Sequence, residues 1–299
     1  MQTQKNIFAT VLTYPAPSSN YRGEREENRN VLQTISKGGH EYPVVSPEAM
    51  RSALREILTA YGLPMNRRRL RDQSQLAVEY KSFPDADTYA DDFLFGFFVT
   101  DHKLMKERGE AAKRDSVLRM NLAVALSPSR HNTTLHQSPV NTGASPWKNS
   151  ARSALIQKEV AYTAFQYPFA ISLGDCTQGK GPDWTRALLR AIGEISRVGG
   201  GHTRNHYEMA PRSIVVRFTT SLVAGFGTYG FAEDASFPEL SRVHAGDLPG
   251  QDFWIGGELA RNFAAPERKR LLKEGVRLFD NPQALLGELA AAAFRRGKA

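Results

Sequence analysis

Two arginines stand four residues apart at the start of a predicted helix, a spacing that suits phosphate binding. Arg51 and Arg55 follow an apolar stretch that ends at Ser46, a residue type that often caps helix N-termini. Residues four apart are neighbours on a helix surface, so the two guanidinium groups would lie on successive turns. The free amides and the helix dipole favour anions at this end. The alternative is an ordinary surface helix with solvated arginines.

A second polar stretch, residues 199–212 (GGGHTRNHYEMAPR), joins three glycines to side chains that can donate hydrogen bonds. Glycine lets the backbone approach a ligand closely and adopt positive φ. The side chains that follow would serve the phosphates, 2′-hydroxyls and bases of RNA alike. A helix C-cap followed by a polar turn would explain the same pattern.

The two histidines of this stretch, His202 and His206, raise sharper hypotheses. A metal pair would need a third histidine or clustered carboxylates at ligand spacing, and none follows. Acid–base cleavage of RNA is possible in principle, but nothing nearby marks an activated nucleophile. Asp91 and Asp92 could bind a metal, although acidic doublets usually belong to solvated surface. No nucleotide-binding, zinc-protease or serine-hydrolase motif occurs. We therefore expect no catalytic residue, no metal site and no cofactor.

The stretch from Ser127 to Ser150 has no periodicity, which is typical of a disordered segment or of a loop that orders on binding. Residues 116–158 contain no Asp or Glu. Trp147 and Lys148, with Arg152 nearby, form an aromatic-plus-cation element that could stack on a base. Trp147 could equally anchor its own loop.

The charge distribution favours a polyanionic partner. The chain of 299 residues has a net charge of +8, and the excess lies in residues 1–75 and 121–231. Its single cysteine, Cys176, excludes an internal disulfide. The sequence has neither a membrane-length apolar run nor a signal-peptide core, so we expect a cytoplasmic protein without membrane contact.

Hydrophobic periodicity predicts the elements that must position these residues. Residues 14–30 are expected to form a long polar loop, and residues 103–119 a helix or an inserted surface lobe. The order strand–helix–strand, interruption, strand–helix–strand predicts an α+β fold with a ferredoxin-like (RRM-like) sheet and long insertions. The predicted strands are 7–13, 31–36, 42–45, 93–100, 160–173 and 213–219, and the predicted helices begin at 47 and at 183.

The segment VVSPEAMRSALRE, residues 44–56, is similar to the helix signature of the RAMP superfamily of CRISPR-associated proteins. On that match Arg51 takes the phosphate-facing basic position and Arg55 the terminal arginine. The first strand, the polar loop with Asn20 and Arg22, residues 34–37 and the glycine-rich run are arranged as in the DevR family. The chain thus resembles the backbone subunit of type I CRISPR surveillance complexes (Cascade), most closely type I-B.

This resemblance implies a single RRM-like domain over residues 1–299, whose palm carries a finger-type insertion at 62–120 and an extended thumb loop at 127–152. Copies of the subunit would polymerise along a crRNA, which then pairs with target DNA, in a complex with other Cascade subunits. Each thumb would displace one nucleotide at a regular interval. The expected RNA-binding residues are Asn20, Arg22, Lys37, Ser46, Arg51, Arg55, Arg67, Arg68, His131, Trp147, Lys148, Arg152, Gly200, His202, Thr203, Arg204 and His206.

Two alternative functions remain open at this point. One is a RAMP-type, metal-independent RNA endonuclease that processes repeat RNA, with His202 or His206 as the catalyst. The other is a generic RNA-binding or developmental regulatory protein that acts without a guide.

Overall fold

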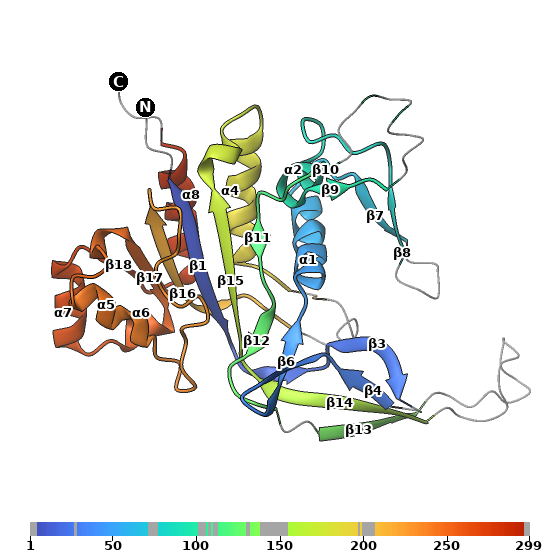
Figure 1. Cartoon of the computed structure of the whole chain (residues 1–299), viewed down its shortest axis with the longest axis horizontal. Coiled ribbons are helices and arrows are strands. Elements are labelled where there is room, and N and C mark those ends of the chain that lie inside the picture. Colours follow the sequence, from blue (N-terminus) through green and yellow to red (C-terminus); the bar gives the residue numbers. More distant parts are fainter. Residues whose placement is uncertain are drawn as a thin grey trace, which may run out of the picture.

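A computed structural model gives the fold of the chain (Figure 1). It describes residues 5–26, 29–70, 77–100, 106, 109, 113–129, 132–137, 155–196, 198 and 207–295, with the backbone alone at 22–26, 69, 70 and 77. Within these residues, no helix is both long and apolar enough to cross a membrane.

The largest sheet in the described part of the chain has nine strands in the order β18-β17-β16-β1-β15-β12-β6-β5, with β11 also paired to β15. Its pairs are antiparallel except for β17 and β18, which run parallel, so the sheet is mixed. The strands are β1 (Asn6–Thr13), β5 (Thr34–Lys37), β6 (His40–Val45), β11 (Arg119–Met120), β12 (Ala123–Ala125), β15 (Phe165–Ser172), β16 (Pro211–Thr219), β17 (Phe253–Gly257) and β18 (Arg277–Phe279).

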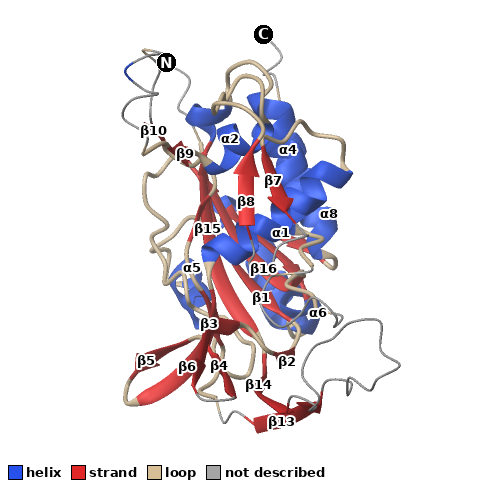
Figure 2. Ribbon diagram, turned by 90° about the vertical axis from the view of Figure 1, so that its right-hand side faces the viewer, coloured by secondary structure: helices blue, strands red, loops and turns tan. Residues whose placement is uncertain are grey.

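Both faces of this sheet are buried, and β1 shows how its sequence achieves this. Ile7, Ala9 and Val11 pack into one hydrophobic cluster, while Leu12 belongs to the other. One cluster lies under α1 (Pro47–Ala60), α2 (Ala90–Phe95), α4 (Gly181–Ile192) and α8 (Pro282–Ala293) (Figure 2). The other is covered by α5 (Ser241–His244), α6 (Glu258–Asn262), α7 (Ala265–Lys273) and short turns η3 (Pro238–Leu240) and η4 (Gly250–Asp252). A further turn, η1 (Leu173–Cys176), follows β15.

A smaller sheet adjoins the start of β15, at the bottom of Figure 1. Glu159 is almost fully buried there; its carboxylate accepts a hydrogen bond from Leu32 N at 3.0 Å and pairs with Arg29 at 3.4 Å. These contacts fasten β14 to β4. The strands are β2 (Ala16–Ser18), β3 (Tyr21–Glu26), β4 (Arg29–Leu32), β13 (Asn132–Gln137) and β14 (Leu155–Thr163).

Two short hairpins lie beside the C-terminal half of α1, at the upper right of Figure 1. They are β7 (Arg67–Leu70) with β8 (Ala77–Tyr80), and β9 (Phe97–Phe98) with β10 (Lys113–Arg114). Gly96 joins α2 to β9 at a φ of 67°, and a Cβ there would lie 2.4 Å from the carbonyl oxygen of Arg114. Glycine is therefore required at this junction.

The expected mixture of helices and strands is confirmed, and so are the strands at 7–13 and 213–219 and the helices that begin near 47 and 183. Both predicted polar loops contain strands. Residues 16–18, 21–26 and 29–32 are strands, because β2 and β4 pair with β14 far along the chain. Residues 132–137 form β13 instead of loop.

The predicted buried strand at 93–100 was also wrong. Residues 90–95 form α2, and Phe98 is 66% exposed. A short apolar run fits a buried strand and a buried helix equally well, and here Gly96 divides the run. The predicted strand at 160–173 is two strands, β14 and β15, which belong to different sheets.

Candidate nucleic-acid interface

The start of α1 follows from its sequence. Ser46 is extended (φ −71°, ψ 149°), and its hydroxyl accepts a hydrogen bond from Ala49 N at 3.2 Å. Pro47 occupies the first turn, where an amide proton would have no partner. The buried face of the helix is formed by Met50, Ala53, Leu54 and Leu58. This face fixes the rotation of the helix and leaves the arginines on its flank.

Arg51 and Arg55 lie on that flank, as the spacing predicts. The Nη1 atom of Arg51 is 4.0 Å from a carboxylate oxygen of the exposed Glu48. Arg55 is only 16% exposed, and its guanidinium lies over the ring of Phe95, 4.6 Å from the centroid. The Nε atoms of both arginines are buried, and neither makes a hydrogen bond among the described residues. Each arginine thus retains unused donor capacity.

Burial and the neighbouring Arg67 lower the pKa of Arg55 to about 10, although the nearby Asp91 acts in the opposite direction. The Nε atom of Arg55 lies 3.8 Å from an oxygen of Asp91. Arg55 remains charged at neutral pH, but its charge is poorly solvated. A phosphate placed beside it would supply the counter-charge that water does not.

The β7–β8 hairpin brings two further predicted residues to the same place. Arg67 donates from Nε to the hydroxyl of Tyr80 at 3.0 Å, and its guanidinium also lies over that ring. Arg68 pairs with Glu79 through a 2.7 Å hydrogen bond. In the antiparallel register Tyr80 lies opposite Arg67 and Glu79 lies opposite Arg68. The pairing of the two strands therefore holds both arginines in place.

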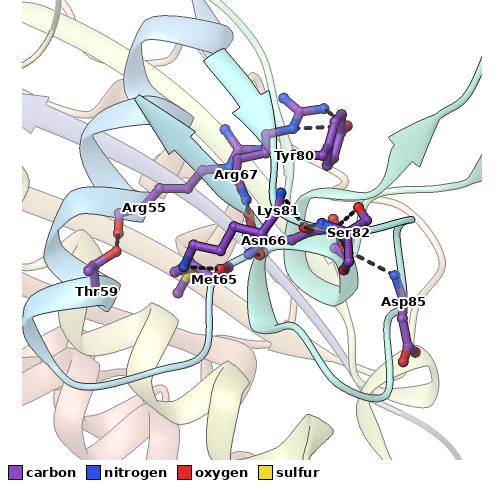
Figure 3. Close-up of polar contacts among 11 residues, drawn as sticks. Arg55, Thr59, Met65, Asn66, Arg67, Tyr80, Lys81, Ser82 and Asp85 are labelled. Atoms are coloured by element: carbon purple, nitrogen blue, oxygen red, sulfur yellow. Dashed lines mark hydrogen bonds and ion pairs between the residues drawn. The ribbon is translucent and has the colours of Figure 1, made fainter. Parts of the chain in front are cut away.

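The hairpin is attached to the body by Asn66, drawn in Figure 3, and by two buried carboxylates. Asp91 accepts hydrogen bonds from the backbone amides of Asn66 at 2.7 Å and Arg67 at 2.9 Å. Asp92 accepts from the Asn66 side chain at 2.7 Å and from Asp85 N at 2.9 Å. Burial raises the pKa of Asp92, while the donors from Asn66 and Asp85 oppose that rise.

These two carboxylates are each 1% exposed, so the expectation that the acidic doublet is solvated surface was wrong. They form a structural anchor: because Asp91 contacts both Arg55 and the amide of Arg67, it ties α1 to the hairpin. Among the described residues, no group of three or more His, Cys, Asp or Glu side chains could hold a metal ion.

Together these elements enclose a cavity of about 860 Å³, which we call the α1 groove. Seven basic residues and three acidic ones line it, so it carries a positive charge. The lining residues are Glu48, Arg51, Ser52, Arg55, Glu56, Thr59, Met65, Arg67, Arg68, Val78, Lys81, Phe95, Gly96, Phe97, Phe98, Lys113, Arg114, Asp115 and Ser116. The predicted residues Arg51, Arg55, Arg67 and Arg68 therefore share one groove.

Other predicted residues lie elsewhere. Ser46 uses its hydroxyl as the helix cap. Asn20 is buried, and its amide donates to the carbonyl of Val44 at 2.9 Å, which is a structural role. Lys37 is exposed near the turn of the β5–β6 hairpin, over the ring of Tyr42. The side chain of Arg22, and the residues His131, Trp147, Lys148, Arg152, Gly200, His202, Thr203, Arg204 and His206, lie outside the described part of the structure.

The groove also contains basic residues that the sequence did not single out. Lys81 donates to the carbonyl of Met65 at 2.9 Å, and Arg114 lies over the ring of Phe93. Both belong to charge-dense stretches without helical or strand periodicity, so the sequence offered no signal beyond charge. Their place in the groove depends on the two hairpins.

The mixed sheet and the α1 groove define a protein with a preformed basic surface suited to a polyanion. No protein-family model matches the chain. Over 286 residues the chain is 28% identical to a protein of Myxococcus xanthus (strain DK1622) described as CRISPR-associated protein Cas7/Cst2/DevR. That match covers 89% of this chain and 91% of the relative.

Two solved structures share the fold. One is a chain of a CRISPR RNA-guided surveillance complex in a pre-nicking state, with a TM-score of 0.63 and 12% identity. The other is a chain of a CRISPR RNA-guided surveillance complex, with a TM-score of 0.60 and 16% identity. Each match covers 97% of this chain and 100% of the solved chain. The likeness therefore extends over the full architecture.

Proposed function

We propose that this chain is a crRNA-binding backbone subunit of a CRISPR surveillance complex. The observation that carries the proposal is the α1 groove, where Arg51 and Arg55 from the helix meet Arg67 and Arg68 from the hairpin. Arginine guanidinium groups bind phosphate with paired, charge-assisted hydrogen bonds. The descriptions of the sequence relative and of the two structural neighbours support the same function.

The proposed palm is the RRM-like core of the large sheet. The strand order β16-β1-β15-β12, with α1 and α4 on one face, is the order that a ferredoxin-like fold would have. In this proposal residues 62–120 are the finger-type insertion and residues 127–152 the thumb loop, carried by the β13–β14 hairpin. All of these belong to one domain over residues 1–299.

The proposed partners follow from this role. Copies of the subunit tile the crRNA as a helical filament, and other Cascade subunits complete the complex. The proposed subunit is most like that of a type I-B complex. The crRNA pairs with target DNA, and the thumb displaces nucleotides at a regular interval. The subunit acts in the cytoplasm during antiviral defence and performs no catalysis itself.

Two measurements on purified protein test this function. Nucleic acid that co-purifies with the chain should be RNA of repeat–spacer origin, identified by sequencing. The mass of protein bound to synthetic RNA should rise in steps as the RNA is lengthened, because each copy covers a fixed length. One copy bound at every RNA length would contradict the filament.

The endonuclease alternative has its own clear outcome. Metal-independent cutting of a stem-loop repeat RNA, lost in His202→Ala or in His206→Ala, would replace the proposed role with repeat processing. We expect the RNA to stay intact with the wild-type chain and with both variants.

A further inference from the structure

A second basic surface lies at the opposite edge of the large sheet, at the start of β1 and beside β17 and β18. It surrounds a cavity of about 380 Å³, the edge hollow, lined on its charged side by Lys5, Arg277 and Arg295. Its floor is formed by Phe218 and Trp254. Five strands of the sheet, β17, β16, β1, β15 and β12, separate β18 from β6, the strand that leads into α1 (Figure 1).

Aromatic rings hold two of these cations in place. The Nζ atom of Lys5 lies 4.4 Å from the centroid of Phe218, and the guanidinium of Arg277 lies 4.5 Å from that of Trp254. The two rings meet edge to face at 6.0 Å, and Arg277 is directly opposite Trp254 in the β17–β18 register. Cation–π contacts of this kind restrain a side chain without neutralising its charge.

Two of the three cations have no carboxylate partner among the described residues. Neither Lys5 nor Arg277 forms an ion pair within the described structure. The acidic residue of the hollow, Asp252, accepts two hydrogen bonds at 3.3 Å from the buried Arg217. Arg295 makes one long contact of 3.9 Å with Glu288. The hollow therefore presents two cations, Lys5 and Arg277, that rest on aromatic rings and form no ion pair among the described residues.

We propose that the edge hollow binds the phosphodiester backbone of a nucleic acid, as a site separate from the α1 groove. The floor rings cannot stack on bases, because Trp254 is 2% exposed and Phe218 is 7% exposed. The exposed cations reach a ligand while the rings do not, so the contact is made to phosphate and does not read sequence. The nucleic acid held here is a second one, distinct from the RNA in the groove.

The proposal predicts that protein already saturated with RNA still binds a DNA duplex of unrelated sequence. The test measures this binding by the anisotropy of a fluorescein-labelled duplex at several salt concentrations. Lys5→Gln/Arg277→Gln should weaken duplex binding about tenfold or more, and should reduce the slope of log affinity against log salt by about 1.8. The affinity for RNA should stay within about twofold of wild type.

The matched control is Lys269→Gln/Lys273→Gln on α7, which removes the same charge from exposed lysines outside the hollow. It should leave both affinities and both slopes unchanged. Lys5→Gln alone, at an exposed residue before β1, should retain the wild-type melting temperature. It should reduce the slope of log affinity against log salt by about half as much as the double variant does. Arg277→Lys should retain most of the duplex affinity.

Two results would overturn the site. If the double variant and the α7 control bind the duplex equally, the hollow does not hold phosphate, and an acidic protein becomes the next partner to test. If the double variant loses RNA affinity with the same change of slope, the hollow holds the groove's own RNA and no second nucleic acid. Either result leaves the proposed crRNA-binding function standing, because that function depends on the groove variants.

Discussion

The α1 groove and the edge hollow present positive charge in two different ways. In the groove, Arg55 is mostly buried and shares the carboxylate of Asp91 with the backbone of Arg67. In the hollow, Lys5 and Arg277 are exposed, rest on aromatic rings and form no ion pair with a described residue. The groove cations are therefore coupled to the fold, while the hollow cations are coupled only to their local floor.

Because of this difference, substitutions in the two regions should differ in how they affect folding stability and nucleic-acid affinity. A buried charge costs free energy unless a partner compensates it, so a change in the groove affects folding as well as binding. An exposed charge is screened by salt and contributes little to folding. We therefore expect substitutions in the groove to divide between unstable and binding-deficient variants, whereas substitutions in the hollow should affect binding alone.

The largest expected effect tests the anchor beneath the groove. Asp91→Ala leaves the amides of Asn66 and Arg67 without their acceptor and the guanidinium of Arg55 without its counter-charge. We expect a loss of about 3–5 kcal/mol in the free energy of unfolding. Urea unfolding measures this loss.

The control for the anchor is Asp87→Ala, which changes an exposed carboxylate in the same segment. It should stay within about 0.5 kcal/mol of wild type. Equal stability of the two variants would mean that the buried pair is not an anchor. The groove cations would then not be coupled to the fold more strongly than the hollow cations.

The next effect concerns binding. Arg55→Ala removes a partly desolvated cation from the groove, and we expect about 1.5–3 kcal/mol less affinity for single-stranded RNA. The affinity is measured by filter binding, with the melting temperature measured alongside. Arg186→Ala, which removes a partly exposed arginine of α4 paired with Asp183, should bind RNA normally.

A smaller effect tests the hairpin. Tyr80→Phe removes the hydroxyl that accepts from Arg67 but keeps the ring beneath the guanidinium. We expect about 0.5–1.5 kcal/mol less RNA affinity, because Arg67 loses one restraint and keeps its charge. An equal loss of RNA affinity in Tyr80→Phe and Arg67→Ala would show that the hydroxyl, and not the cation, is the binding group.

The smallest effect lies on the far side of the sheet. The Arg212 guanidinium, hydrogen-bonded to Glu258, lowers the pKa of that carboxyl. The stabilisation is thus present above the ordinary value of about 4.5 and is lost as the pH falls through the lowered pKa. Because the pair is partly exposed, Glu258→Gln should cost at most about 1 kcal/mol at about pH 7 and nothing at about pH 3. Urea unfolding at both pH values measures the difference.

The sequence predicted the parts of the site that depend on local signals. The Ser46 cap, Pro47 and the apolar periodicity of α1 are all encoded within fifteen residues, and they placed Arg51 and Arg55 correctly. Arg67 and Arg68 were found from charge alone. The sequence did not indicate that these two arginines share a groove with α1, and the structure shows it.

The parts that were missed depend on contacts between distant residues. Asp91 and Asp92 are buried because Asn66, about 25 residues earlier, supplies their hydrogen-bond donors. The strands β2 and β4 form because β14, more than 120 residues later, pairs with them. A sequence pattern alone does not reveal such pairings, since each strand is too short and too polar to show a clear period.

The most direct test of the central claim is the salt dependence of RNA binding by the wild type and by Arg51→Gln/Arg55→Gln. If both arginines contact phosphate, the slope of log affinity against log salt should decrease by about 1.4, since each contact to single-stranded nucleic acid contributes about 0.7. The melting temperature is measured alongside, because Arg55 lies 3.8 Å from the buried Asp91 and is coupled to the fold. Parallel slopes for the two proteins would contradict the account, because RNA would then bind without the α1 groove.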